Sequence, residues 1–500
     1  MIKNMAIYLP HLTPRVAANV EGSKLPSFLI ALEAWRRGLT VTVKHKKFFH
    51  YSITYQKEQK GWKKYLAKLL PLTLNRQDKV TYSFYRGIAN IVPPKTLRAA
   101  KDKDLAKLYL SRVGISVPEG KKFAAATFDG EVLAYARDLG YPVVIKPAGS
   151  SGGKGVFTNI KNGATLQEYL AYLKNELNVA EFLVEKHING DDFRAYVLGD
   201  RVLAVTKRIP ANVVGNGFDT IQQLIAAKNE QRKKNPSLRK GLIKIDKELL
   251  DYIQGAGYNL DSVLEEGKQL FLRGKSNVLA GGDMVDVTDE APDSLKETAV
   301  RAVKPFPGLI QAGVDIIADF ERKQIVVNEI NSIPAIGLHI FPGSGQARDI
   351  PSAIIDYYFP ESCRYKNLNR NVYFDVKKAL KPLKDGKAKE ITIAPAPSHK
   401  IKCKKILISG EVQGVGFEEW VQRQARKLNL SGFIKLKKDR KLMVVVAGRK
   451  KNIVKFTQRC LQGPKAARVF KVESMKWKKP VMIGFKIFGK KQKTFCCYLN

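Results

Sequence analysis

Acidic residues and cysteines are both scarce in this sequence. Asp and Glu number 46 against 87 Lys and Arg, so the formal net charge is +41 over 500 residues. The cysteines are sparse and odd in number, and none has the spacing of metal ligands; they are Cys363, Cys403, Cys460, Cys496 and Cys497. These absences argue against a disulfide-stabilised secreted scaffold and a cysteine-rich zinc domain, and we expect a protein of the reducing cytoplasm.

Long hydrophobic runs are absent as well. No apolar stretch approaches the ~18 residues of a membrane-spanning helix. The apolar run within residues 1–10 is too short for a secretory signal, so we predict a first strand there. An apolar content of 44% with 9% aromatic residues excludes a disordered chain, and the length of 500 residues predicts roughly three domains.

Positive charge is concentrated at one end of the chain. The last hundred residues contain 26 Lys or Arg against five Asp or Glu. Such a field attracts polyanions, namely nucleic acid, anionic lipid, an acidic peptide or an anionic cell-wall polymer. The alternative is a lysine-rich, solvated surface without a partner. No RNA- or DNA-reading motif accompanies the charge.

Composition and element patterns divide the chain into four parts. Residues 1–95 form a small α/β lobe, and residues 96–360 alternate helix and strand, which is typical of α/β construction. A polar segment at 228–275 is interpreted as an insertion in this second part. Residues 361–400 lose apolar density and end in Ala-Pro-Ala-Pro-Ser-His, which predicts an extended linker. Residues 401–492 form the last domain.

The last domain has the element order βαββαβ, which predicts an α+β, ferredoxin-like sandwich. Its first elements are expected at residues 405–409, 418–428, 432–435, 441–447 and 451–460. In the N-terminal lobe we expect a strand at 6–9, an amphipathic helix at 25–37 and a strand at 39–44.

A glycine-serine loop follows a short apolar strand at residues 141–155, which read Tyr-Pro-Val-Val-Ile-Lys-Pro-Ala-Gly-Ser-Ser-Gly-Gly-Lys-Gly. Lys146 is a cation at the exit of the strand. Backbone N–H groups of the loop are not shielded by Cβ atoms at its glycines, so they can close over phosphate oxygens. Alone this is a weak signal, because most glycine-rich turns bind nothing.

Two apolar strands carry acidic residues near the end of the second part. Asp315 lies in Ala-Gly-Val-Asp-Ile-Ile-Ala-Asp, and Glu329 lies in Val-Val-Asn-Glu-Ile-Asn. Buried carboxylates are costly unless a cation neutralises them. Asn331, two residues beyond Glu329, points to the same face and adds an oxygen ligand. Hard oxygen ligands beside a triphosphate suit Mg²⁺, and the alternative is a salt-bridged strand pair.

Five blocks in order resemble the ATP-grasp ligases, over about residues 90–360. They are Asp102-Lys103 with Gly114-Ile-Ser-Val-Pro118, the loop at 141–155, Phe182 to Arg194, residues 201–225 with 272–282, and the two acid-bearing strands. The fourth block looks specifically like cyanophycin synthetase and the ATP-grasp part of the bifunctional glutathione synthetases. Where the family usually has Pro-Gly, this chain has Pro334-Ala335, a change we expect to be tolerated. The resemblance implies an ATP-grasp fold.

The resemblance also implies roles toward ATP. The residues that would hold or cover its phosphates are Lys103, Lys146, Ser150, Ser151, Gly152 and Gly153. The adenine would be surrounded by Glu185, Lys186 and Ile188. The ribose hydroxyls would be reached by Asp192. The alternatives are a solvated lysine at position 103 and a hairpin with a salt-bridged acidic turn in the third block.

Further residues match positions around the reacting groups of related enzymes. Those that would face the acyl phosphate are Arg208, Arg273 and Asn277. Guanidinium groups stabilise the dispersed negative charge of a phosphoryl group in transfer, and the alternative for each arginine is an exposed charge. The implied ligands of Mg²⁺ are Asp315, Glu329 and Asn331, with two ions expected and Mn²⁺ as an alternative metal.

The implied reaction is amide-bond formation. MgATP phosphorylates a substrate carboxylate, and an amine then displaces phosphate from the acyl phosphate, with release of ADP and phosphate. The substrates would be an amino acid, a short peptide or an acidic polymer, and we expect a homo-oligomer. A non-catalytic alternative is a polyanion-binding protein that uses the ATP-grasp fold as a scaffold.

Residues 403–490 resemble an acylphosphatase. The match lies in Gly410-Glu-Val-Gln-Gly-Val-Gly-Phe417 and Leu430-Ser-Gly-Phe-Ile434. In that family an arginine after the Gly-Phe grips the phosphate, and an asparagine on the next strand positions the attacking water. This chain has Glu418 and Leu436 at those positions. We therefore predict a degenerate, inactive domain, with hydrolysis of acyl phosphates as the alternative function.

Overall fold

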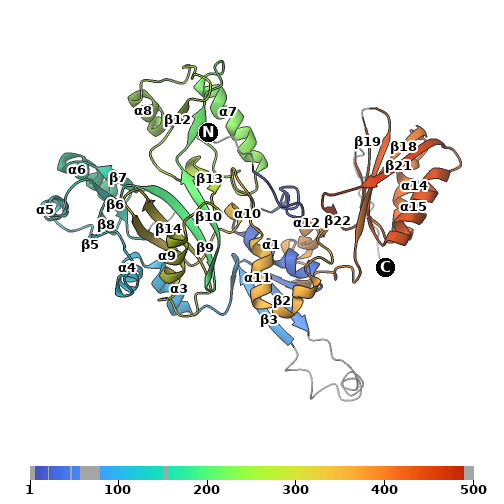
Figure 1. Ribbon diagram of the computed structural model, residues 1–500, viewed down its shortest axis with the longest axis horizontal. Helices are drawn as coiled ribbons and strands as arrows, with labels where there is room; N and C mark the ends of the chain where they lie inside the picture. The colour runs from blue at the N-terminus through green and yellow to red at the C-terminus, as the bar shows by residue number, and fades with distance from the viewer. Residues whose placement is uncertain are drawn as a thin grey trace, which may run out of the picture. The chain divides into compact units, whose positions relative to one another are not determined.

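The computed structural model describes residues 6–20, 22–45, 48–56, 79–149, 155–437 and 439–488. It divides into two compact units, one formed by Met1–Tyr8 and Arg86–Ile350 and the other by Leu9–Tyr85 and Pro351–Asn500 (Figure 1). This grouping differs from the predicted order of parts, because the N-terminal lobe and the last domain fall in one unit. Within the described residues, no helix has the length and apolar character needed to cross a membrane.

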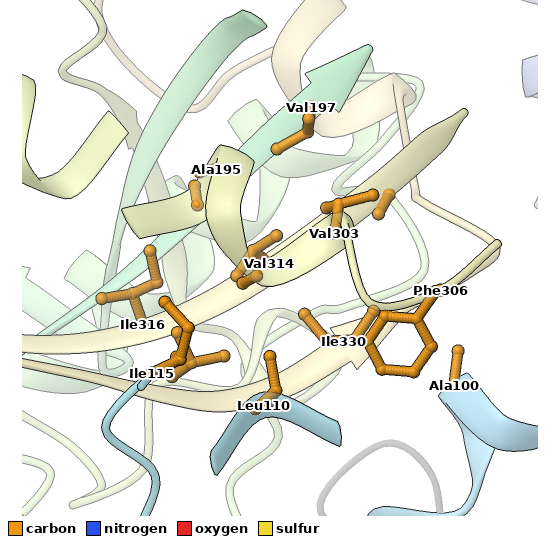
Figure 2. Packing of buried hydrophobic residues seen from close by; sticks show 14 of the residues in the cluster. Ala100, Leu110, Ile115, Ala195, Val197, Val303, Phe306, Val314, Ile316 and Ile330 are labelled. Carbon is orange, nitrogen blue, oxygen red and sulfur yellow. The ribbon is translucent and has the colours of Figure 1, made fainter. Parts of the chain in front are cut away.

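The first unit contains a five-stranded antiparallel sheet in the order β13-β10-β9-β14-β15. Its strands are β9 (Asp191–Leu198), β10 (Arg201–Ile209), β13 (Asp283–Asp286), β14 (Gln311–Asp319) and β15 (Gln324–Asn331). One face packs against α3 (Pro94–Lys101), α4 (Lys103–Arg112) and α9 (Asp293–Val303). Figure 2 shows Val314, Ile316 and Ile330 in this core with Leu110 and Phe306. Since side chains alternate along a strand, the residues between them face the other side of the sheet.

A second sheet in the same unit has the order β5-β8-β6-β7. It consists of β5 (Gly120–Ala124), β6 (Val143–Pro147), β7 (Phe157–Ile160) and β8 (Glu181–Lys186), with α5 (Asp129–Leu139) and α6 (Gly163–Ala171) sharing its core. The predicted strand after Tyr141 and the predicted strand ending at Lys186 are both confirmed. The loop residues Ser150, Ser151, Gly152 and Gly153 lie outside the described residues.

Smaller elements complete this unit. A third core gathers β11 (Asn212–Val214), α7 (Ile221–Lys234), α8 (Lys247–Gly255) and β12 (Gln269–Phe271). The segment predicted as an insertion within this part, 228–275, shares its apolar core with residues that precede it, such as Val213 and Ile221. Two short elements are β4 (Ile88–Ala89) and α10 (Gly337–Ile340). The strand predicted at 6–9 is only an isolated bridge at Ile7.

In the second unit, a sheet places β17, β1, β2 and β3 side by side in that order. Its elements are α1 (Lys24–Arg36), β1 (Thr40–His45), β2 (Phe49–Gln56), β3 (Lys79–Tyr85) and β17 (Glu390–Thr392). The helix α1 is not amphipathic as predicted, since every residue after Lys24 is buried. Its buried charge is paired: Arg37, just past the helix, contacts Glu33 at 2.8 Å and Asp356 at 2.6 Å.

The predicted linker is structured. Strand β17 pairs with β1 through Ile391 and Val43, so this part of the segment adds an edge to a sheet. The linker region also contains β16 (Val372–Tyr373), α12 (Val376–Ala379) and α13 (Lys381–Lys384), and α11 (Ile350–Tyr358) precedes it. Burial of Leu380 and Leu383 holds it in place, which an extended proline-rich linker would not need.

The ferredoxin-like prediction for the last domain is confirmed, with the sheet order β21-β18-β20-β19-β23. Its elements are β18 (Lys402–Glu411), α14 (Phe417–Lys427), β19 (Ser431–Leu436), β20 (Leu442–Gly448), α15 (Lys450–Gln462), β21 (Arg468–Lys476), β22 (Val481–Met482) and β23 (Phe485–Phe488). The two helices share one core with the inward residues of the central strands, such as Ile406 and Val444. Strand β22 pairs with β16.

Candidate active site

The two predicted strand acids lie directly opposite each other. Asp315 on β14 is the cross-strand partner of Glu329 on β15. Both lie on the face of the sheet away from the helices, because their neighbours Val314, Ile316 and Ile330 fill the core. Asn331 lies on the same face, and its Nδ2 donates to Asp315 Oδ2 at 3.2 Å. The structure therefore brings together all three predicted metal ligands.

Two guanidinium groups neutralise the Asp315 carboxylate. Arg194 donates from Nε to Oδ1 at 2.6 Å and from Nη2 to Oδ2 at 2.8 Å, and Arg208 Nη1 lies 3.2 Å from Oδ2. Burial alone would raise the pKa of Asp315, but the charges of Arg194 and Arg208 outweigh it and hold that pKa below its ordinary value. Arg194 has no role in the sequence-based prediction. Its position two residues after Asp192 on one strand was the available signal, because such residues share a face.

Asp192 completes this charge cluster. It accepts from Arg208 Nε at 2.9 Å and from Nη2 at 2.5 Å. Burial by itself would lower the pKa of Arg208, but the nearby Asp315 and Asp192 carboxylates raise it above its ordinary value. Around Asp315, two carboxylates thus pair with two guanidinium groups. The predicted role of Arg208 toward an acyl phosphate remains a prediction.

Burial raises the pKa of Asp192 to about 6, although Arg208 opposes this shift. A carboxyl group whose pKa is higher in the folded state than in the unfolded state adds stability below pH ~4 and loses it as the pH rises toward 6. We therefore expect the stability of the wild type relative to Asp192→Asn to fall between pH 4 and pH 6, then level off. Thermal unfolding of both proteins across this range measures the difference. The exposed Asp200→Asn is the control, and a difference independent of pH would contradict the assignment.

Lys103 connects the first helix block to the strand acids. Asp102 caps the start of α4, because its side chain accepts from the backbone N–H groups of Asp104 and Leu105 at 3.1 Å. Lys103 follows as the first helical residue, and its Nζ lies 3.8 Å from Glu329 Oε1. The predicted phosphate-binding lysine and a predicted metal ligand therefore belong to one site.

A second charge cluster lies on the other sheet. Glu185 is buried and accepts from Lys146 at 2.7 Å and from Lys107 at 2.6 Å. Gly120 is its cross-strand partner on β5, where a Cβ atom would lie 2.6 Å from the Cγ of Glu185. Lys146 also lies 3.4 Å from Asn328 Oδ1 on β15, so the two sheets meet here. Lys107 was missed by the sequence reasoning, although it lies one helical turn after Lys103.

The residues predicted around adenine lie at the end of β8 and in the segment that follows it. The side chain of Lys186 donates to the carbonyl oxygens of Gly140 at 2.7 Å and Leu139 at 3.3 Å, at the end of α5. Strand β8 is flanked by β5 and β6 at Glu185, so its backbone there is already within the sheet. After Lys186, the backbone N–H of His187 donates to Pro142 O at 3.0 Å, and the half-buried Ile188 follows. The adenine contacts of Glu185, Lys186 and Ile188 remain predictions.

Arg273 and Asn277 are tied to the third core. Arg273 is bound by Asp246 at 2.7 Å and by Glu248 at 2.6 Å, and its side chain is buried. Asn277 accepts from the backbone N–H of Leu279 at 2.9 Å. Among the contacts of the described residues, neither reaches Asp315 or Glu329. Local carboxylates thus engage Arg273, and Asn277 caps the short helix at Val278–Ala280.

The donors at the strand acids suit a divalent cation. Two carboxylates and one amide oxygen are hard ligands, and the lowered pKa keeps Asp315 ionised, as a metal ligand must be. A cation there would share Asp315 with Arg194 and Arg208. Within the part of the chain that the structure describes, no group of three or more His, Cys, Asp or Glu residues could hold a metal. The predicted ligands Asp315, Glu329 and Asn331 do not form such a group, because only two of them are carboxylates.

Two parts of the chain match known protein families. Residues 102–207 match the family "Carbamoyl-phosphate synthase L chain, ATP binding domain", and residues 404–487 match the family "Acylphosphatase". The chain is 35% identical over 271 residues to the glutathione biosynthesis bifunctional protein GshAB of Listeria innocua, covering 52% of this chain and 34% of that protein. It is 32% identical over 270 residues to the cyanophycin synthetase of Geminocystis herdmanii, covering 53% of this chain and 30% of that protein.

The matched region is thus about a third of the length of these relatives. A solved bifunctional glutathione synthetase from Pasteurella multocida is 28% identical with a TM-score of 0.43, covering 56% of this chain and 40% of that chain. The chain contains an ATP-grasp domain homologous to those of cyanophycin synthetase and GshAB, followed by a C-terminal acylphosphatase domain.

Proposed function

We propose that this protein is an ATP-dependent carboxylate–amine ligase that forms an amide bond through an acyl phosphate and releases ADP and phosphate. The observation that carries the proposal is the meeting of Lys103 and Lys146 with β15, at Glu329 and Asn328. Lys103 thus lies beside Glu329, an acid predicted for a metal, and Lys146 lies beside Asn328, the residue that precedes Glu329. The related ligases support the reaction class.

The chemistry needs electrostatic stabilisation and positioning. Lys103 and Lys146 would offset the phosphate charge, and Arg208 would stabilise the phosphoryl group as it passes to the substrate carboxylate. A divalent cation held by Asp315, Glu329 and Asn331 would neutralise the outer phosphates. The amine would then attack the acyl carbon, and phosphate would leave. The roles of Arg273 and Asn277 toward the acyl phosphate remain predictions.

Product analysis tests the reaction. Purified protein with MgATP and pairs of candidate acids and amines, drawn from amino acids, short peptides and acidic polymers, should release ADP and phosphate only when both substrates are present. Release of AMP would contradict the proposal, because it indicates adenylation of the acid. Failure to bind MgATP would contradict it as well.

The C-terminal domain is proposed to be inactive as an acylphosphatase. Its glycine loop is intact, with Gly414 and Gly416 at φ of 72° and 67°, but Glu418 lies in the first turn of α14, just after the loop. A carboxylate there repels an anionic substrate, and Leu436 on β19 cannot orient a water. The lysine-rich surface of this domain is proposed to bind an acidic partner. The homo-oligomer and the cytoplasmic location also remain predictions.

Restoring the two missing groups should create hydrolysis. The full-length wild type is expected to leave benzoyl phosphate intact without ATP, and Glu418→Arg with Leu436→Asn should raise its hydrolysis at least about tenfold, since a single stabilising group at a reacting centre is worth more than this. Release of benzoate measures the rate. Glu473→Arg on β21 makes the same change of charge elsewhere in the domain. Hydrolysis by the wild type would contradict the proposal.

A further inference from the structure

The cluster around Glu185 contains one more lysine than its charge requires. The Glu185 side chain is 2% exposed, and it contacts Lys107 and Lys146, whose side chains are 13% and 9% exposed. Each lysine takes a different carboxylate oxygen, Oε1 for Lys107 and Oε2 for Lys146. A single buried carboxylate is thus neutralised twice, which leaves an excess of positive charge in the cluster.

The two lysines are held differently. Lys107, on α4, also donates to the carbonyl oxygen of Pro118 at 3.1 Å, which anchors it beside Glu185. Lys146 is at the end of β6, directly before the glycine-serine loop, and its second contact is a longer one of 3.4 Å to Asn328. Lys146, the lysine proposed to bind phosphates, is therefore held less firmly than Lys107.

Releasing a lysine from a buried carboxylate is costly when no other cation is near. Breaking one partner away from a buried ion pair leaves an uncompensated charge and is strongly destabilising. With Lys107 at 2.6 Å, Glu185 keeps a partner when Lys146 leaves. Burial lowers the pKa of Lys107, and the charge and hydrogen bond of Glu185 oppose this shift.

We propose that Lys107 is a positioning residue that keeps Glu185 neutralised while Lys146 turns from Glu185 to the phosphates of ATP. This inference rests on the proposed function, because it requires the phosphates of ATP to bind at Lys146. It assigns Lys107 no contact with the nucleotide. Lys107 acts through Glu185, by lowering the cost of freeing Lys146.

A double-mutant cycle tests the proposal on the full-length chain. The readout is the Kd for the non-hydrolysable analogue AMP-PNP with Mg²⁺, measured by calorimetry. Lys107→Met should raise the Kd about 10- to 100-fold, because Lys146 must then leave Glu185 unpaired. In the Glu185→Gln background, no buried carboxylate is left unpaired when Lys146 moves away. Lys107→Met should therefore change the Kd by less than about threefold. If Lys107→Met does not fold, Lys107→Gln replaces it in both backgrounds.

The outcomes separate this role from the alternatives. If Lys107→Met weakens binding by the same factor in both backgrounds, Lys107 acts directly on the phosphates and the proposal is overturned. A Kd unaffected by Lys107→Met also overturns it. Arg112→Met removes an exposed charge from the same helix and should leave the Kd within about twofold. A wild type that does not bind AMP-PNP overturns the proposed function itself, whereas an additive cycle overturns only the role of Lys107.

Discussion

Replacing Glu329 by Gln is expected to lower the rate of ADP formation about 10²- to 10³-fold. The change keeps the shape of the side chain but removes the charge that faces Asp315 and Lys103. An interaction with the charge that develops on a transferring phosphoryl group is worth this much, because it acts mainly in the transition state. ADP release, with saturating acid and amine substrates, measures the effect.

The matched control is Glu321→Gln, an exposed glutamate in the turn between β14 and β15. It makes the same chemical change a few residues away and should leave ADP formation unaltered. Normal turnover in Glu329→Gln would remove the basis for a metal-assisted ligase. Under the non-catalytic alternative, the substitution would leave polyanion binding untouched and there would be no turnover to lose.

Asp315→Asn is expected to destabilise the first unit by about 3–5 kcal/mol. Arg194 and Arg208 would remain largely buried at 2.6–3.2 Å from a group that no longer carries a charge. Arg208 would keep Asp192 as a partner, but Arg194 would lose its carboxylate. Removing one partner of a buried ion pair costs this much, because the remaining charge is neither solvated nor paired. In a unit of this size, the melting temperature should fall by about 10 °C. Calorimetry that resolves the unfolding of this unit measures the shift.

Two further variants test the cause. Arg194→Met in the Asp315→Asn background should restore part of the lost stability, because it removes the guanidinium left without its carboxylate. Asp293→Asn is the control. The Asp293 side chain is 92% exposed, and its ion pair with Lys296 is long, at 3.9 Å, so its loss should cost little stability. A melting temperature for Asp315→Asn within a degree of the wild type would mean that the cluster does not depend on this charge.

Local pattern predicted the elements that carry the site. The apolar alternation around Asp315 and Glu329 placed both on strands, and the Asp102-Lys103 pair marked the start of a helix. These predictions are confirmed because period-two burial and helix capping depend on neighbouring residues only. The helix at 24–36 was found, but its complete burial was not, because that depends on what packs around it.

Contacts between residues that are far apart in the sequence were not predicted. Arg194 and Lys107 were missed, and Arg273 is bound by Asp246 and Glu248 away from the strand acids. An arginine in an apolar strand indicates that a partner exists, but its identity depends on the register of the sheet. The predicted linker failed for the same reason, since Ile391 pairs with a strand more than three hundred residues earlier in the chain.

The sequence by itself determined which residue types fall together along the chain: a lysine before a glycine-serine loop, acids on apolar strands, and a glycine loop followed by Glu418. Each of these is set by residue type and short-range spacing. Only the tertiary structure decided which charges neutralise one another, because Glu185 meets Lys107 and Lys146, and Asp315 meets Arg194, through contacts between separate elements. Buried charges must be paired where they are buried, and that position exists only once the sheets and helices have packed.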